Sequence, residues 1–313
     1  MTITERAVVA TLLYADLFNF PLLLPEVHRK LQTSSNTTLS QVLKALNNLV
    51  KAKIIFQKGG YYFLPGRSET VVLRKKRMEI YKKKFQKLKN LLVFLTSCPW
   101  VVGIFLTGSL AAANSSDEDD IDLLIITSRN RLWLARLWLI LQTEFMGLRI
   151  HKTTTCQKDK LCLNVFLEED ALRLPKSKRN LYTAHEILHA QAVFARNNCE
   201  KRFKEKNKWV LNFLPQAFNS KDMEKRSMLR IQKQEITTID VVSKVSLPRV
   251  LSSIFTFFGD ICNIASYYLQ FWYKRRKLSS QDILRNQAFL HESNLSEKVL
   301  NVFSARKKSF RLI

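Results

Sequence analysis

The chain has 313 residues and carries 51 lysines and arginines against 26 aspartates and glutamates, so its formal net charge is 51 − 26 = +25. A hydrophobic content of 46%, with only seven glycines and seven prolines, excludes a disordered or collagen-like chain and disfavours a hairpin-rich all-β fold. The length predicts about two domains. The charge favours an acidic partner, a class that includes nucleic acids, nucleotides and anionic membranes.

Cysteine usage and the first residues indicate the compartment. The five cysteines are an odd number and form no Cys-x-x-Cys pair, which argues against a disulfide framework and against a zinc ribbon. Residues 1–20 include Glu5 and Asp16 and lack a small-residue cleavage site, so they do not resemble a signal peptide. We therefore predict a cytoplasmic protein.

The most apolar segment covers residues 247–273. Its longest charge-free run, Ile261 to Tyr273, has 13 residues. A helix that spans a bilayer needs about 20 apolar residues, so we predict no transmembrane segment. Four basic residues, 274–277, follow directly and leave a role at a membrane surface open.

The pattern of residues 1–66 predicts three helices followed by a β-hairpin. Thr4 can cap the first helix, Pro25 lies in the first turn of the second, and apolar residues at helical spacing predict the third over 39–52. A Gly-Gly turn between two short β-forming runs predicts the hairpin. Its strands are expected over 54–56 and 61–64.

This order of elements resembles the winged helix-turn-helix family. In DNA-binding members the third helix enters the major groove, so the resemblance implies nucleic-acid contacts from this segment. Lys44 and Lys51 are the candidate phosphate contacts. The side chains that could read bases are Gln41, Asn47 and Asn48. Use of this domain for protein contacts is the alternative.

A long basic helix is predicted to connect this domain to the next, over residues 67–97. The stretch 74–89 holds nine lysines and arginines and one glutamate, a net charge of 9 − 1 = +8. Apolar residues recur every three or four positions from Met78 to Leu95 and form one stripe. We expect this stripe to pack against a domain and the basic face to point outward, with Lys75 and Lys76 as candidate nucleic-acid contacts.

The motif that carries chemistry lies between two apolar runs of strand length, the first at 101–106. That run leads to Gly108-Ser109, and ten residues later Asp120-x-Asp122 opens the second run. A glycine lets the backbone approach a phosphate closely, and a serine adds a hydroxyl donor. Two carboxylates two residues apart on a strand project from one face, where a hard cation such as Mg²⁺ relieves their repulsion.

This string resembles the signature of the nucleotidyltransferases of the DNA polymerase β superfamily, and the resemblance covers residues 98–170. It implies an α+β core with a mixed sheet and helices on one side. It also implies Mg²⁺- or Mn²⁺-dependent transfer of a nucleoside monophosphate from a nucleoside triphosphate to a hydroxyl, with a nucleic acid or a protein as acceptor. By the same resemblance, Gly108 and Ser109 hold the triphosphate, and Asp120 and Asp122 are the catalytic metal ligands.

Active family members usually bring a third carboxylate from a later strand. The candidate strand here is 161–167, whose central polar residue is Asn164, and Glu168, Glu169 and Asp170 follow it. Asn164 and Glu168 are therefore the candidate third-ligand positions. An amide cannot act as a base and is a poorer ligand for a hard cation. The alternative function is accordingly a non-catalytic regulator that keeps the nucleotidyltransferase fold and binds nucleic acid.

A second motif, His185-Glu186-x-x-His189, matches the zincin pattern. Histidines four residues apart on a helix share a face and could bind one Zn²⁺, with the glutamate as base. The further glycine and histidine of the metzincin extension are absent. Residues 182–194 predict an amphipathic helix, within a helical stretch over 182–214 that is interrupted near Asn197-Asn198, so surface histidines are the simpler interpretation. A zinc hydrolase is the third and least favoured function.

The last part of the chain predicts a C-terminal helical region. Residues 216–246 are polar and predict a linker or an insertion, and helices are expected over 250–273 and 279–305. In the family that the motif resembles, a helical domain after the core commonly supplies contacts to the acceptor. The predicted α+β protein thus divides into a winged-helix-like domain, a connecting helix, a nucleotidyltransferase core and a helical region, at 1–66, 67–97, 98–215 and 216–313.

Overall fold

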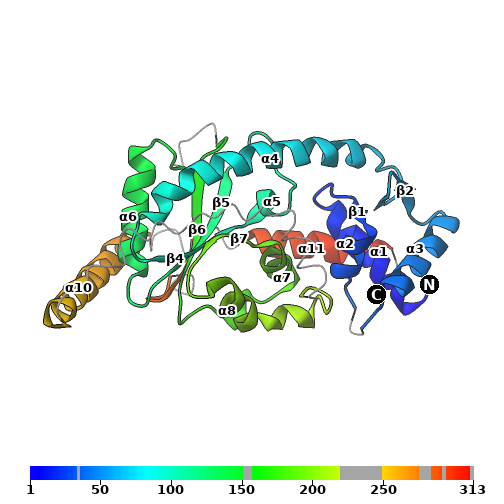
Figure 1. The fold of residues 1–313 in the computed structure, drawn as a ribbon. Helices are drawn as coiled ribbons and strands as arrows, with labels where there is room; N and C mark the ends of the chain where they lie inside the picture. Colours follow the sequence, from blue (N-terminus) through cyan, green and yellow to red (C-terminus); the bar gives the residue numbers. More distant parts are fainter. Residues whose placement is uncertain (34–35, 151–156, 219–248, 275–282, 291–293, 311–313) are drawn as a thin grey trace.

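The structure is a computed structural model, and it shows an α+β protein with one mixed five-stranded sheet and one small antiparallel sheet (Figure 1). The predicted α+β class is confirmed at this level. The four cysteines among the described residues are free. No helix in the described part of the chain is long and apolar enough to cross a membrane. The described ranges are 1–33, 36–150, 157–218, 249–274, 283–290 and 294–310.

The amino-terminal part contains three helices and the small sheet. The helices are α1 (Ile3–Asp16), α2 (Leu24–Arg29) and α3 (Leu39–Lys51). The strands are β1 (Leu22–Leu23), β2 (Phe56–Lys58) and β3 (Tyr61–Phe63), in the antiparallel order β1-β3-β2. The predicted helices and hairpin are confirmed, whereas the two-residue β1 is too short to give a pattern.

The cap of α1 differs from the prediction. Thr2, and not Thr4, is the N-cap, because only Thr2 has a glutamate three residues later. The Thr2 hydroxyl accepts from the backbone N–H of Glu5, and the Glu5 carboxylate accepts from the N–H of Thr2 at 2.8 Å. This reciprocal capping box satisfies two of the free donors at the start of the helix.

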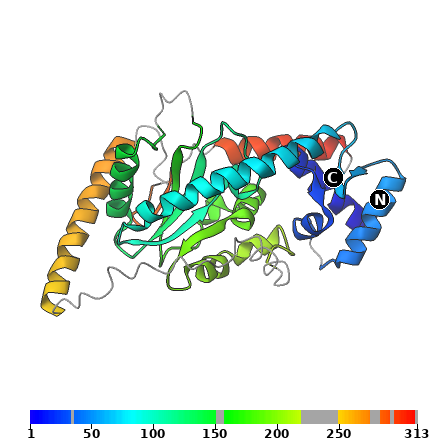
Figure 2. The same ribbon diagram turned by 45° about the horizontal axis from the view of Figure 1, so that its top comes forward.

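Helix α4 (Glu69–Thr96) joins this part to the large sheet and runs along the length of the molecule (Figure 2). Its predicted apolar stripe is confirmed at the carboxyl-terminal end, where Leu88, Leu92 and Leu95 are buried against the sheet. The prediction that its basic face points outward is wrong at two positions. Arg74 and Lys84 are buried, because each is paired with acceptors on other elements.

The large sheet has the strand order β7-β4-β5-β6-β8. Its only parallel pair is β5 with β6, and the other neighbours are antiparallel. The parallel pair is joined through α6 (Leu132–Phe145). The strands are β4 (Val101–Leu106), β5 (Ile121–Thr127), β6 (Leu161–Glu168), β7 (Gln191–Ala195) and β8 (Gln287–Phe289).

Helices cover both faces of this sheet, which corrects the expectation of helices on one side. Alternate strand residues belong to two separate cores, as Ile125 and Ile126 illustrate. Helices α4, α6 and α10 (Arg249–Lys274) lie on the face of Ile125. The other face is covered by α7 (Leu181–His189), α8 (Cys199–Lys206) and the short helix η2 (Lys208–Asn212).

The carboxyl-terminal third differs most from the prediction. A strand, β7, interrupts the helix expected over 182–214, and β8 lies inside the helix expected over 279–305. Both strands are edge strands whose neighbours lie far away in the chain, so local periodicity does not mark them. Most of the predicted linker over 216–246 lies outside the described residues, because residues 219–248 are not among them.

The last helix, α11 (Asn294–Ser309), returns to the amino-terminal helices. Phe303 is buried in the core that α1 and α3 form, and Arg306 pairs with Asp16 at 2.6 Å. Residues 216–313 therefore contribute β8 to the sheet and α11 to the amino-terminal core, in addition to α10. They do not form a separate helical unit in the described part of the chain.

Candidate functional site

The Gly-Ser motif follows β4 and forms the first two residues of the four-residue helix α5 (Gly108–Ala111). The backbone N–H of Thr107 donates to the carbonyl of Asp122 at 3.0 Å, which holds this turn against the start of β5. Gly108 has a φ of +65°, and a Cβ at this position would lie 2.2 Å from Asp122 Oδ2. Glycine is therefore required both by the backbone and by the close approach of the carboxylate.

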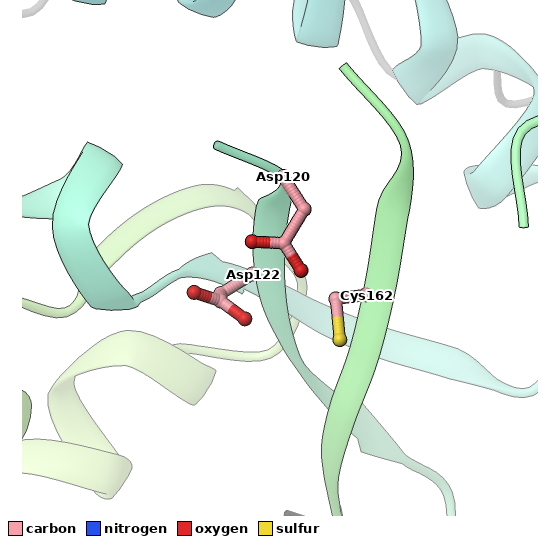
Figure 3. Close-up of side chains that lie close together, drawn as sticks. All are labelled: Asp120, Asp122 and Cys162. Carbon is pink, nitrogen blue, oxygen red and sulfur yellow. The ribbon is translucent and has the colours of Figure 1, made fainter. Parts of the chain in front are cut away.

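The two aspartates point from one face of β5, as their spacing predicted. Asp122 is paired across the parallel strands with Cys162 on β6. Asp120, Asp122 and Cys162 each offer one ligand atom, and these three atoms lie within 4.8 Å of one another (Figure 3). This is the only such group of three metal-ligating side chains among the residues that the structure describes.

The donor set fits a divalent cation. Ligand distances of about 2.0–2.6 Å allow one ion to reach donor atoms at these separations. The two carboxylates are hard ligands suited to Mg²⁺ or Mn²⁺, whereas the Cys162 thiol is a softer donor. Burial, and then the negative charges of Asp122 and Asp120, raise the pKa of that thiol. The arrangement thus places two carboxylates and a protonated thiol around one point.

Asn164 lies at the site but does not supply a carboxylate. Its amide nitrogen donates to Asp122 Oδ1, and its amide oxygen lies 2.7 Å from the thiol sulfur of Cys162. The side chain is buried, and β6 has a register irregularity at this point. Of the two candidate third-ligand positions, Asn164 therefore contacts Asp122 and Cys162, and it orients Asp122.

Glu168 lies away from the site. It is paired with Thr127 at the other end of β5, five residues beyond Asp122. Its buried carboxylate accepts from the backbone N–H of Leu132 at 3.3 Å, at the start of α6. Burial raises the pKa of this carboxyl, although backbone donors near Asn130 oppose the shift. Glu168 thus caps a helix and does not join the aspartates.

The other two acidic residues after β6 are also paired elsewhere. Glu169 accepts from Arg202 at 3.1 Å, and Asp170 lies 3.4 Å from Arg129. Neither belongs to the group around Asp120 and Asp122. The strand that was expected to bring a third carboxylate thus brings a thiol and an amide.

Ser109 organises the loop that leads to the aspartates. Its hydroxyl donates to Asp119 Oδ2 at 2.9 Å, and the same carboxylate accepts from the N–H of Ser116 at 3.0 Å. Burial raises the pKa of Asp119, but the donors from Ser116 and Ser109 outweigh it and leave the pKa lowered. From α4, the buried Lys84 ammonium donates to the Asp119 carbonyl. The loop is thereby held rigidly next to Asp120.

Glu186 lies next to the Gly-Ser turn, although the sequence motif suggested it as the base of a zinc hydrolase. One of its carboxylate oxygens accepts from the backbone N–H of Gly108 at 3.3 Å. Glu186 also raises the pKa of Tyr182, after burial, and Asp122 contributes to the same shift. Helix α7 therefore brings a third negative group next to the Gly-Ser turn. No local signal reveals this contact, because it depends on α7 packing against α5.

The histidines of the second motif do not gather with a third ligand. His185 is buried and stacks on Tyr14, with ring centroids 4.3 Å apart. Burial, and then the charge of Lys30, lower its pKa well below the usual value. The rings of His185 and His189 have centroids 6.0 Å apart, and neither residue belongs to a group of three ligands in the described chain. The geometry gives the zinc interpretation no support.

The candidate nucleic-acid contacts are all exposed. Lys44 and Lys51 lie on α3, and Lys75 and Lys76 lie on the first half of α4. The two α4 lysines line a shallow surface pocket together with Tyr61 of β3. Among the possible base-reading residues, Asn48 donates to Glu5 at 3.1 Å. These lysines therefore lie on α3 and on the first half of α4, whereas Asp120 and Asp122 lie at the start of β5.

Comparisons of the chain with models of protein families, with curated proteins and with solved structures found no match. What the site can do is therefore inferred from its own residues.

Proposed function

We propose that the chain is a metal-dependent protein of the nucleotidyltransferase class. The observation that carries this proposal is the Asp120, Asp122 and Cys162 group beside a glycine whose Cβ position is filled by Asp122. Within that class, we propose transfer of a nucleoside monophosphate from a nucleoside triphosphate to a hydroxyl acceptor. The resemblance of the strand–Gly–Ser–Asp-x-Asp string to the DNA polymerase β superfamily supports this particular reaction.

Each residue has a role in this proposal. Asp120 and Asp122 would hold Mg²⁺ or Mn²⁺, which when bound neutralises phosphate charge and lowers the pKa of an attacking hydroxyl. The Asn164 amide keeps Asp122 oriented toward the site. The backbone of Gly108 and the hydroxyl of Ser109 would face the triphosphate, and this hydroxyl would have to leave Asp119, to which it donates. Glu186 accepts from the Gly108 N–H, so a phosphate that uses this donor must displace the carboxylate.

The first prediction tests this function. Asp120→Asn and Asp122→Asn should each reduce nucleotidyl transfer by about 100-fold or more, because each removes charge from the proposed metal site. Transfer is measured with labelled nucleoside triphosphates, Mg²⁺ or Mn²⁺, and pooled RNA, DNA and protein acceptors. Mn²⁺ binding, followed by electron paramagnetic resonance, is measured on the same proteins.

The matched control is Asp117→Asn, in the same loop. Asp117 is exposed and pairs with Lys158, away from the ligand group. This variant should keep both Mn²⁺ binding and transfer. A wild-type protein that binds neither Mn²⁺ nor a nucleoside triphosphate would exclude the proposed enzyme.

The second candidate is a nucleic-acid-binding regulator without turnover. Two observations favour it: β6 places Asn164 where family members have a carboxylate, and Glu186 accepts from the N–H of Gly108. We infer that residues 1–66 form a winged helix-turn-helix, which the element order and the exposed lysines of α3 support. Under this function, metal and nucleotide bind but no product forms.

The regulator function predicts how nucleic-acid affinity depends on the salt concentration. DNA or RNA affinity should fall steeply with salt, and the double variant Lys75→Ala/Lys76→Ala should reduce the slope of log K against log salt by about 2, roughly 1 for each phosphate contact. Lys44→Ala/Lys51→Ala should do the same if α3 contacts the backbone. An affinity independent of salt would exclude this function.

A further inference from the structure

Helix α10 turns its polar side toward the protein. Asn263, Ser266 and Gln270 are buried on the side that faces α6. Asn263 Oδ1 accepts from the backbone N–H groups of Trp133 and Leu134 at 2.9 and 3.0 Å, at the start of α6. Gln270 donates to the carbonyl of Trp133 at 2.9 Å. These hydrogen bonds to the α6 backbone attach α10 to the body, together with Tyr267 and Phe271, which pack on the sheet core.

The opposite side of α10 is apolar and exposed. Its side chains recur at helical spacing and are each 47–64% exposed. The only charged residue between 258 and 272, Asp260, pairs with Arg131 of the body. Helix α10 thus exposes apolar residues that an ordinary surface helix would bury, while Tyr267 and Phe271 do pack on the core. The exposed apolar residues are Phe258, Ile261, Ile264, Tyr268, Leu269 and Trp272.

Neighbouring helices at this end of the molecule also expose apolar side chains. Helices α6 and α10 lie together at the end of the molecule opposite the amino-terminal part (Figures 1 and 2). On α6, Trp138, Leu141 and Phe145 are exposed, and Phe145 is 95% exposed. On the end of α4, Val93 and Phe94 are exposed as well. This end of the protein therefore exposes large apolar side chains on three helices, and a concentration of such side chains is typical of an interaction surface.

We propose that this end, which we call the α6–α10 face, binds the surface of an anionic lipid bilayer. Aromatic residues such as Tyr268 and Trp272 favour the interface between water and acyl chains. Although α10 has 26 residues, it is too polar on one side to span the bilayer, and among the described helices none qualifies as a span. It would lie in the plane of the surface with its apolar side inserted.

Charge favours a lipid surface over a second copy of the chain. Arg285 lies 3.4 Å from the hydroxyl of Tyr268, and in the sequence Lys274 begins a run of four basic residues. Basic residues near an anionic bilayer attract it, and Arg285 is such a residue on the described face. A dimer would instead bring together two chains of net charge +25. This inference does not depend on the proposed nucleotidyl transfer.

The test is flotation of the full chain with vesicles of phosphatidylcholine alone and of phosphatidylcholine with phosphatidylglycerol. We expect binding to the anionic vesicles that weakens with salt. The double variant Ile261→Glu/Leu269→Glu should weaken it by about tenfold or more, since burying one such side chain contributes about 1.5–3 kcal/mol. The matched control Val302→Glu changes an exposed apolar residue on α11 and should leave binding unchanged.

Circular dichroism of the double variant must show an unchanged fold, because both substituted side chains are exposed. The proposal is overturned if the wild-type chain does not float with anionic vesicles. It is also overturned if the double variant floats as well as the wild type. A dimer that the double variant abolishes, in a chain that binds no vesicles, would assign the face to a second copy instead.

Discussion

At the scale of single residues, Gly108 shows why the motif has its particular composition. The residue combines a φ of +65° with a carboxylate 2.2 Å from the position of a Cβ. Any side chain would therefore both strain the backbone and push Asp122 away from Asp120 and Cys162. The glycine is required by the carboxylate as much as by any phosphate.

The second prediction concerns this position. Gly108→Ala should lower the free energy of unfolding by about 2–4 kcal/mol, from about 1–2 kcal/mol of backbone strain and a further cost of the clash. It should also weaken Mn²⁺ binding, because Asp122 must move. Urea unfolding and metal titration measure the two effects.

Gly66→Ala is the matched control for this substitution. Gly66 has a φ of +73°, but nothing lies within 4 Å of its Cβ position. The control should lose only about 1–2 kcal/mol of stability and no metal affinity. Equal losses in the two variants would show that Asp122 does not restrict position 108.

A second residue-scale feature is the ion pair between the buried Arg74 and the half-buried Glu26. The two side chains form a bidentate contact, with N–O distances of 2.6 and 2.8 Å. Burial raises the pKa of Glu26, but the hydrogen bonds and charge of Arg74 outweigh it and leave the pKa below its ordinary value of 4.5. A lowered carboxyl pKa means that folding favours the ionised form. Its stabilising contribution is present above pH 4.5 and is lost as the pH falls through the lower folded-state pKa.

The third prediction follows from the lowered pKa of Glu26. Glu26→Gln should cost about 3 kcal/mol near neutral pH, because it leaves the buried Arg74 charge without its partner. The wild type should lose this advantage over the variant as the pH falls below 4.5. Urea unfolding across pH measures the difference. Glu69→Gln, at an exposed position with only a 3.5 Å contact to Arg67, should show no such convergence.

At the scale of elements, α4 both connects the amino-terminal part to the sheet and supports the site. Its apolar residues pack on the sheet. Its basic residues contact the loops that contain Asp119 and Asp159, which the sequence pattern did not predict. Lys84 donates to the Asp119 carbonyl and lies 3.4 Å from Asp159 Oδ1, and Lys87 pairs with the same carboxylate. The helix thereby fixes the loop one residue before Asp120.

The fourth prediction compares two neighbouring lysines of α4. Lys84→Met should destabilise the fold by about 1–3 kcal/mol, because it removes the donor to a carbonyl next to the site. It should also weaken Mn²⁺ binding, since the loop positions Asp120. Lys83→Met, at an exposed position, should change stability by less than about 0.5 kcal/mol. Identical behaviour of the two variants would contradict the role given to Lys84.

At the scale of the whole molecule, the first and last described helices, α1 and α11, pack against each other. Phe303 of α11 meets the Tyr14 ring edge-on at 5.2 Å, and Tyr14 stacks on His185 of α7. Asp16 pairs with both Arg67 and Arg306. The amino-terminal helices, α11 and the sheet domain are therefore coupled through one continuous set of contacts.

The fifth prediction tests this coupling. Phe303→Ala should lower the free energy of unfolding by about 3–5 kcal/mol, because it leaves a cavity in the amino-terminal core. Tyrosine and tryptophan fluorescence should follow one common transition in the wild type. Val302→Ala, at the exposed neighbouring position, should have little effect. Separate transitions in the wild type would show that the parts unfold independently.

Much of the local structure could be predicted from spacing alone. Period-four apolar residues marked α3 and α4, and two unbroken apolar runs marked β4 and β5. The alternation of side chains along a strand was enough to place Asp120 and Asp122 on one face. These features depend on neighbours within a few residues, so the chain order records them directly.

Contacts between distant segments leave no pattern in the sequence, and only the packing of the elements decides them. The pairing of β5 with β6 placed Cys162 opposite Asp122, and the docking of α7 brought Glu186 to Gly108. The burial of Lys84 and of Asn263 on α10 likewise depends on acceptors and donors that other elements supply. Sequence spacing fixes which face of an element a residue occupies, but only packing decides what that face meets.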